Sequence, residues 1–248
     1  LHNRTHSFPT RRSSDLNPDG SSYVVTSNKR ACRIRFCMQC EAARSAKRRD
    51  KVRTIFAEVF RKKPDVRALF LTLTSRNRPI DAVGTMFDDH EQALKRFWRL
   101  QRIASATLGH LTVFECDVRG TLEAPQAGVH THTLVFVEPG YFSDQRYLRQ
   151  REWAEHWRHA LRVDYRPIVD VRPVLDRRGE GDQQAVMNAA REVAKYVTDP
   201  KGFIHSEDGR LAVEPTVIAA LSRALHRRRL VRFDRIVADA AKRLRMKE

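Results

Sequence analysis

The chain has 248 residues, which is enough for one domain with a substantial core and appended segments. Its 47 Lys and Arg against 30 Asp and Glu give a formal net charge of +17, and such an excess favours a polyanionic partner, nucleic acid above all. It contains no apolar run long enough to span a membrane and no recognisable secretory leader, and its four cysteines favour a reducing compartment, so we expect a cytoplasmic protein.

The first sixteen residues differ in character from the rest of the chain. The chain begins with Leu1 instead of Met, and the string HSFPTRRSSDL at 6–16 resembles the translation of a short-read sequencing adapter. We therefore interpret residues 1–16 as an artefact of this kind or as a disordered basic tail, and we expect the true start of the protein to be missing.

Residues 17–55 form a basic segment with a cysteine cluster. Cys32, Cys37 and Cys40 follow the spacing C-x4-C-x2-C between arginines. Thiolates at this spacing suit a structural Zn²⁺ ion, which takes four ligands, and free thiols are the alternative. The fourth ligand is open: Cys116 is one candidate, although a small buried side chain is the simpler interpretation of that residue.

The remaining sequence predicts an α+β fold, with a central antiparallel sheet flanked by helices over 56–200 and a helical, basic C-terminal extension over 201–248. Helix patterns occupy 87–106, 147–161 and 183–199. Strand patterns occupy 68–77, 110–120 and 129–142, and 165–174 is extended. The segment TLEAPQAG between the second and third strands carries the Pro and Gly of a hairpin turn.

The strand that begins with His130-Thr131-His132 is the most informative element. Alternate residues of a strand point to one face, so both histidines project together, about 7 Å apart along the strand. Side chains opposite each other on paired antiparallel strands lie about 5 Å apart, so Glu115 on the preceding strand can face them. Two imidazoles and a carboxylate would bind one divalent cation and leave coordination positions open, as a catalytic metal requires. Solvated polar residues on a strand face are the alternative.

The alanine-rich helix carries a second group of polar residues, in the sequence Glu192-Val-Ala-Lys195-Tyr196. Residues four apart lie on one helix face, so the Glu192 carboxylate and the Tyr196 hydroxyl project together beside Lys195. A tyrosine near a cation is a credible nucleophile towards phosphorus, and a carboxylate one turn away can activate water. A core tyrosine beside surface charges is the alternative.

In this order, FLTLTSRN (70–77), GVHTHTLVFV (128–137) and EVAKY (192–196) resemble the HUH endonucleases, most closely the plasmid rolling-circle replication initiators with a single catalytic tyrosine. The resemblance covers about 32–245 and includes the segment REWAEHWRHALRVDYRPIVDVRPV (151–174) and the cysteine cluster.

The resemblance implies a set of roles. His130 and His132, with Glu115, would hold Mg²⁺ or Mn²⁺; Tyr196 would attack the scissile phosphodiester and leave a 5′-phosphotyrosine and a free 3′-hydroxyl; and Glu192 would activate water at termination. The substrate would be single-stranded or extruded plasmid origin DNA in a bacterial cytoplasm, and a host helicase and polymerase would extend the primer.

The chain departs from the family pattern after the tyrosine, and other functions stay open. Members of the family often carry a lysine three residues after it, where this chain has Asp199, so Lys195 would have to contact the phosphate, with Lys201 as a more distant possibility. The alternatives are a transposase or relaxase with the same chemistry, and a non-catalytic basic DNA-binding protein. Bases could stack on Trp98, Trp153 and Trp157, although their helical spacing favours core packing, and the helices at 216–246 are a weak candidate for origin recognition.

Overall fold

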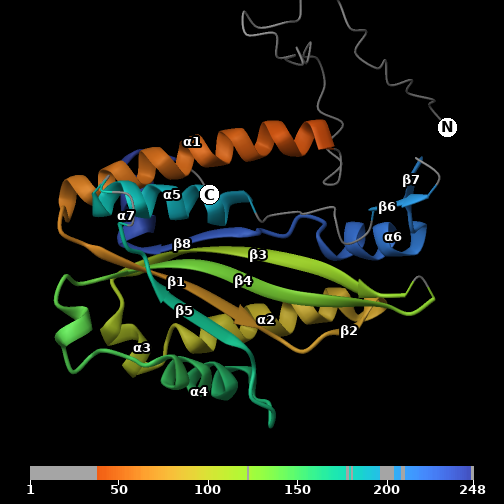
Figure 1. The fold of residues 1–248 in the computed structure, drawn as a ribbon, viewed down its shortest axis with the longest axis horizontal. Helices are drawn as coiled ribbons and strands as arrows, with labels where there is room; N and C mark the ends of the chain where they lie inside the picture. The colour runs from red at the N-terminus through yellow and green to blue at the C-terminus, as the bar shows by residue number, and fades with distance from the viewer. Residues whose placement is uncertain are drawn as a thin grey trace, which may run out of the picture. The chain divides into compact units, whose positions relative to one another are not determined.

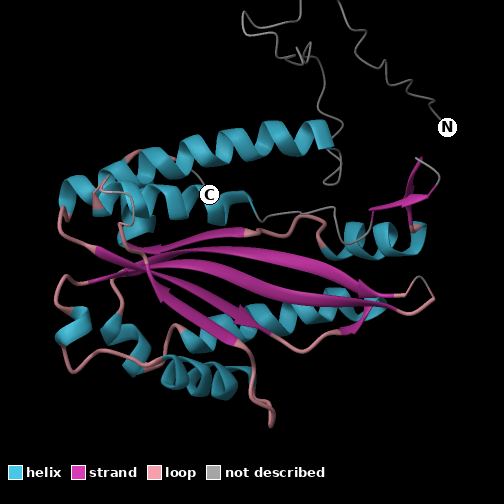
Figure 2. Cartoon of the chain, in the orientation of Figure 1, coloured by secondary structure: helices cyan, strands magenta, loops and turns pink. Residues whose placement is uncertain are grey.

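The computed structural model describes the backbone of residues 38–121, 123–176, 179, 181–195, 204–207 and 210–246. Within these ranges an antiparallel sheet lies between two layers of helices (Figures 1 and 2). The strand order is β5 (Val169–Pro173), β1 (Arg67–Thr74), β4 (Pro125–Val137), β3 (Gly109–Gly120) and β8 (Val231–Arg235), and the short β2 (Arg78–Pro79) pairs with β4 beyond the end of β1. The expected α+β fold with a central antiparallel sheet is confirmed.

The helices divide between the two faces of the sheet (Figure 1). One face is covered by α1 (Met38–Lys62), α5 (Asp182–Lys195) and α7 (Ile236–Arg243), and the other by α2 (Val83–Phe97), α3 (Gln101–Ala106) and α4 (Gln150–Leu161). The helix α6 (Pro215–Ala224) packs against α2. The short elements are the 3-10 turns η1 (Ile80–Ala82) and η2 (Tyr141–Ser143) and the hairpin of β6 (Ile204–Glu207) with β7 (Arg210–Val213). None of the helices in the described part of the chain could cross a membrane.

Coverage of both faces explains why the end of β4 reads as an unbroken apolar run. Phe136 packs edge-on against Phe56 of α1, with ring centroids 5.0 Å apart, while its neighbours Val135 and Val137 are buried against the opposite layer. Strands that are buried on both faces cannot alternate apolar and polar residues. The polar residues that do occur in this strand therefore need a structural or chemical reason.

The helix layer of α2 and α4 contains an aromatic cluster that also supports the end of β1. Trp153 and Trp157 are fully buried and pack around Phe97. The Trp157 indole donates a hydrogen bond of 2.7 Å to the Thr74 carbonyl oxygen at the last residue of β1. Core packing, the interpretation that their helical spacing favoured, is confirmed for both tryptophans, so neither is available for stacking with bases.

The structure differs from the sequence prediction in three places. The single helix expected over 87–106 is two helices, α2 and α3, because the chain turns between them. The boundary expected between 55 and 56 falls inside the continuous helix α1. The C-terminal range 201–248 is not purely helical, because β8 pairs with β3 as an edge strand of the sheet and buries Phe233. The strand β8 was not predicted because its sequence, VRFDR, is rich in arginine and is apolar on one face only.

Two buried histidines predict how stability depends on pH. Burial lowers the pKa of His90 from 6.5 to about 3, helped by His130, and burial lowers the pKa of His110 to about 3, helped by Arg235. The unfolded chain therefore binds more protons than the folded protein at a pH between these values, and the stabilising contribution is complete above pH 6.5 and is lost as the pH falls. We expect the free energy of unfolding to fall by about 2 kcal/mol per histidine between about pH 7 and about pH 5.

Urea unfolding at both pH values measures this effect. His90→Gln should remove about half of the pH dependence, whereas His159→Gln, at an exposed position of α4, should leave it unchanged. If the free energy of unfolding falls equally in His90→Gln and in the unaltered protein, His90 does not cause the pH dependence.

Candidate metal site on the sheet

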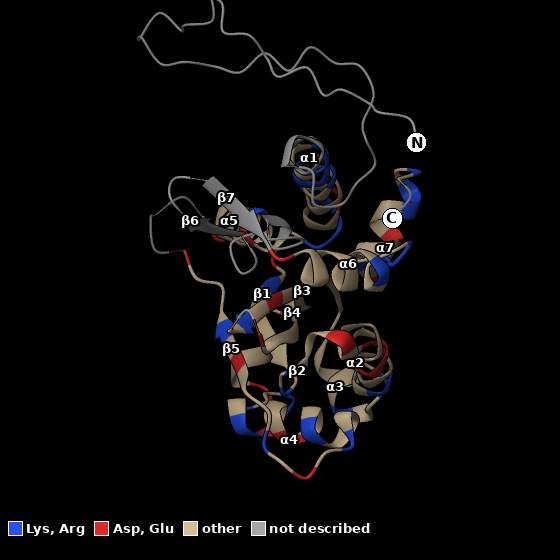
Figure 3. Ribbon diagram, turned by 90° about the vertical axis from the view of Figure 1, so that its right-hand side faces the viewer, with Lys and Arg blue, Asp and Glu red and all other residues tan. Residues whose placement is uncertain are grey.

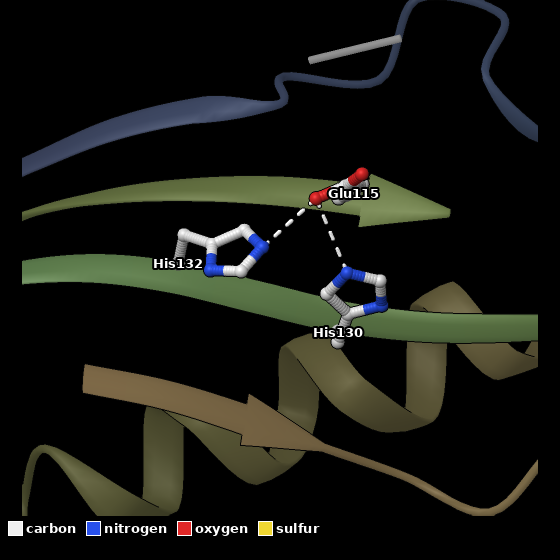
Figure 4. A group of neighbouring side chains, drawn as sticks. All are labelled: Glu115, His130 and His132. Carbon is white, nitrogen blue, oxygen red and sulfur yellow. Dashed lines mark hydrogen bonds and ion pairs between the residues drawn. The ribbon is translucent and has the colours of Figure 1, made fainter. Parts of the chain in front are cut away.

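The pairing of β3 with β4 brings Glu115, His130 and His132 onto one face of the sheet. Glu115 is directly opposite His130, and His132 is opposite Val113, two residues from Glu115 along β3. Because residues of equal parity share a face, all three side chains point towards the layer of α1, α5 and α7. In Figure 4 the Glu115 carboxylate lies between the two imidazole rings. The predicted juxtaposition of these three residues is present, and their role as metal ligands stays a prediction.

The distances between their polar atoms are short. Glu115 Oε2 lies 2.8 Å from His132 Nε2 and 3.1 Å from His130 Nε2 (Figure 4). One ligand atom from each residue can be chosen so that all lie within 4.8 Å of one another. The Glu115 side chain is only 11% exposed, and the histidines are 18% and 14% exposed, so the group is held in place but open to a ligand.

Two further side chains lie beside the histidine rings. The Thr72 hydroxyl of β1 lies 3.1 Å from His132 Nδ1, on the side of the ring that faces away from Glu115. Asp117 Oδ1 lies 3.7 Å from His130 Nδ1, and the Asp117 carboxylate also pairs with Arg119. A hydrogen bond such as that between Thr72 and His132 fixes the ring and selects which nitrogen is free to bind a cation. Sequence reasoning missed Thr72 and Asp117, although Asp117 shares the strand parity of Glu115.

A glycine makes room for polar groups beside His130. Gly128 is opposite Asp117, and a Cβ atom at this position would lie 2.3 Å from Asp117 Oδ1 and 2.7 Å from Asn77 Oδ1. The absence of a side chain therefore lets the Asp117 carboxylate and the Asn77 amide come together over the strand. Asn77 follows β1 and was not singled out from the sequence.

The charge state of Glu115 is set by its neighbours. Burial alone raises the pKa of the Glu115 carboxyl, but hydrogen bonds from His130 and His132 and their positive charge outweigh burial and lower that pKa to about 2. Glu115 is therefore ionised at neutral pH.

The donor set fits a divalent cation. Within the described part of the chain, one carboxylate oxygen and two imidazole nitrogens provide three ligands, and a cation bound by three such groups keeps positions for water or substrate. The hydrogen bond between Thr72 and His132 Nδ1 is of the kind that metal-binding histidines make. The geometry thus supports a catalytic type of metal site over a closed structural one.

The second predicted group of residues is only partly described. The helix α5 packs on β4 and β1, on the sheet face that carries Glu115 and the histidines (Figure 1). Glu192 is exposed on this helix and precedes the buried Val193. Lys195 is the last residue of α5, and its side chain, like all of Tyr196, lies outside the described part of the chain.

The predicted zinc cluster lies almost entirely outside the described residues. Cys32 and Cys37 are not described, and only the backbone of Cys40 is, within α1. Cys116 points away from Glu115, to the opposite sheet face, as its strand position predicted. Burial, with smaller effects from Asp117 and Glu115, raises the pKa of the Cys116 thiol to about 12, so it stays protonated at neutral pH.

The positive charge is distributed over the surface of the described residues. Figure 3 shows Lys and Arg on α1, α4 and α7, with acidic residues on α2 and on several other elements. A distributed field of this kind attracts a polyanion without specifying a sequence.

Comparisons with known proteins agree on one family. Residues 23–248 match the family described as "Replication protein". The chain is 30% identical to "Protein rep" of Lactiplantibacillus plantarum over 88% of its own length and 67% of the relative's. It is 30% identical to "Protein rep" of Streptococcus pneumoniae serotype 2, over 87% of this chain and 63% of that one. It is 28% identical to a "Replication protein" of Staphylococcus aureus, over 77% and 80%. The chain thus spans about two thirds of the length of the first two relatives. No solved structure matches it.

The contact between Thr72 and His132 predicts a measurable effect on metal affinity. Thr72→Val keeps the shape of the side chain but removes the oxygen beside His132 Nδ1, so the ring loses its orienting partner. We expect Mn²⁺ affinity to fall by about 10- to 100-fold, measured by titration calorimetry. Thr74→Val is the matched control, because its hydroxyl on the same strand face donates to the Ile168 carbonyl instead. If Thr72→Val and Thr74→Val bind Mn²⁺ with equal affinity, Thr72 does not contribute to the site.

Proposed function

This chain belongs to the replication protein family, and from that membership and the geometry on β3 and β4 we propose that it nicks a plasmid origin strand to start rolling-circle replication. The enzyme would be a metal-dependent DNA endonuclease and strand transferase that works through a 5′-phosphotyrosine. The observation that carries the proposal is the group of Glu115, His130 and His132, which lies on the sheet face that α5 covers.

The metal site in this proposal consists of Glu115, His130 and His132, and the cation is Mg²⁺ or Mn²⁺. When bound, the cation would polarise the scissile phosphate and offset the negative charge that develops on its oxygens. The protein's own contribution is to hold the ligands: Glu115 is ionised, Thr72 orients the His132 imidazole, and the Asp117 carboxylate lies 3.7 Å from His130 Nδ1.

Cleavage requires a nucleophile close to this site, and Tyr196 is the proposed residue. It directly follows the last residue of α5. The Tyr196 hydroxyl gives up its proton, its oxygen bonds to phosphorus, and the bond from phosphorus to the 3′ oxygen breaks. That oxygen takes up a proton, which leaves a 3′-hydroxyl as the primer end and the 5′-phosphate on Tyr196. Lys195 would contact the phosphate.

Termination requires the phosphotyrosine to be resolved, by rejoining to a 3′-hydroxyl or by hydrolysis. Glu192 is exposed on α5, four residues before Tyr196, and would accept the proton of the attacking water. A carboxylate in this position lets one tyrosine complete the cycle. The proposed partners are single-stranded or extruded origin DNA and the host helicase and polymerase. Zinc at Cys32, Cys37 and Cys40 stays a prediction.

The relatives favour replication over the other functions that share this chemistry. Those compared above are replication proteins by name, which favours an initiator over a transposase or relaxase. A non-catalytic DNA-binding protein would leave the grouping of Glu115, His130 and His132 without a purpose.

A covalent-adduct assay tests the proposal. Single-stranded DNA from the plasmid that carries the gene is incubated with the protein and Mn²⁺, and the product is separated under denaturing conditions. We expect a protein–DNA adduct, and we expect Tyr196→Phe, His132→Ala or added EDTA to reduce it by at least about 100-fold.

Matched variants control this assay. Tyr147→Phe removes an exposed tyrosine hydroxyl and His159→Ala an exposed histidine, and both should form the adduct at the normal level. An adduct that forms equally well in Tyr196→Phe would exclude Tyr196 as the nucleophile. DNA binding without an adduct, on DNA that contains the origin, would favour the non-catalytic function.

The proposed role of Glu192 predicts a different kinetic signature. Glu192→Gln should form the adduct at a normal rate but release it about 100-fold more slowly, because the water loses its base. A pulse of labelled DNA followed by unlabelled DNA measures release. A fall in the rate of formation, with normal release, would assign Glu192 to the cleavage step instead.

A further inference from the structure

A cavity lined by both charged and apolar side chains lies beneath the sheet, on the face opposite to Glu115 and the histidines. Its volume is about 550 Å³, within the range of pockets that bind small molecules or single nucleotides. Its walls come from α2, from the segment that ends α4, and from residues 75–78 between β1 and β2. The mechanism proposed above does not use it.

The cavity is strongly cationic. Arg76, Arg78, Arg96 and Arg162 line it, against the single carboxylate of Asp89. Asp89 pairs with Arg78 at 2.9 Å, and Arg96 donates to the Ala160 carbonyl at 2.7 Å. Within the described part of the chain, Arg76 and Arg162 contact no carboxylate, so their charge is available to an anionic ligand.

An aromatic ring stands beside this charge. The Arg76 guanidinium lies over the Tyr165 ring, 4.1 Å from its centroid, and the Arg76 backbone N–H donates to the Tyr165 hydroxyl at 3.0 Å. Planar guanidinium groups and aromatic rings are the two surfaces on which unpaired bases stack. The combination of unpaired arginines with a held aromatic ring points to a nucleotide as the ligand.

The segment 75–78 connects the cavity directly to the metal site. Thr74 is opposite His130 in the sheet, and the next residue, Ser75, donates both its backbone N–H and its hydroxyl to the Val129 carbonyl. Arg76 then follows at the cavity. The side-chain oxygens of Asn77 and Asp117 both lie beside Gly128, two residues before His130, so neighbouring residues of this segment lie near the two sites in turn.

We propose that this cavity binds a nucleotide of the single-stranded DNA substrate outside the cleavage site, with the base stacked against Tyr165 and Arg76 and a phosphate near Arg162. The inference rests on the proposed function for the identity of the substrate. It adds a positioning role: a nucleotide anchored here would fix which phosphodiester reaches Glu115 and the histidines.

Binding in EDTA tests the inference without any chemistry. The probe is a fluorescein-labelled oligodeoxythymidylate of about 16 nucleotides, and anisotropy gives its affinity. We expect Tyr165→Ala to weaken binding by about 10-fold and Arg76→Ala by a similar factor. Tyr165→Phe, which keeps the ring, should stay within about 2-fold of the unaltered protein, as should Arg151→Ala, which removes an exposed arginine of α4 outside the cavity.

A second measurement uses the unaltered protein, so its result does not depend on whether a variant folds. An oligonucleotide with 5-iodouracil is irradiated with the protein, and the cross-linked peptides are identified by mass spectrometry. Cross-links to Tyr165 or its tryptic peptide support the inference. Cross-links confined to other segments, or equal affinities of Tyr165→Ala and Arg151→Ala, would overturn it.

The two proposals can fail separately. If the cavity variants bind the oligonucleotide with normal affinity and the adduct depends on Tyr196, the nickase proposal stands and the cavity is not a nucleotide site. Loss of affinity without an adduct in any protein would keep the cavity as a DNA site and refute the nickase.

Discussion

The antiparallel pairing of β3 with β4 is the constraint on which the candidate site depends. The register sets Glu115 opposite His130, and a shift of one residue would turn Glu115 to the opposite face, where Cys116 now points. The register is strongly specified because both faces of these strands are packed: a slip of one residue would also turn Phe114, which packs against Phe87 of α2, towards the layer of α1. The candidate site and the packing of the core thus require the same register in the hairpin of β3 and β4.

The neighbouring strand β1 completes the arrangement and links the two helix layers to it. Thr72 orients His132 on one face, and the Thr74 carbonyl accepts a hydrogen bond from Trp157 on the way to the other layer. Directly beyond Thr74, Ser75 is tied to Val129 of β4. Contacts with His132, Trp157 and Val129 therefore hold the end of β1 in place. From this point the chain passes from the metal site to the arginine-lined cavity.

The polar residues of the sheet and of the helix α2 beneath it divide into two kinds. His130, His132 and Glu115 are partly open and contact one another, whereas His90 and His110 on the opposite face are buried and remain neutral at pH 7. Histidines of the second kind contribute to the core and make it sensitive to acid. The residue type does not show which kind a histidine belongs to, because its burial and the charges of its neighbours determine this.

The sequence by itself determined the parts that follow from local periodicity: the α+β class, the strands that carry Glu115 and the HxH pair, and the face that His130 and His132 share. Strand parity is a local property, so it could be read without a structure. The burial of Trp153 and Trp157 followed from helical spacing in the same way. Tertiary structure alone decided the register that selects Glu115, the contacts of Thr72, Asp117 and Asn77, the entry of β8 into the sheet, and the cavity around Arg76 and Tyr165. These features join residues up to 126 positions apart, as in the pairing of Gly109 with Arg235, and no local pattern encodes which distant segments meet.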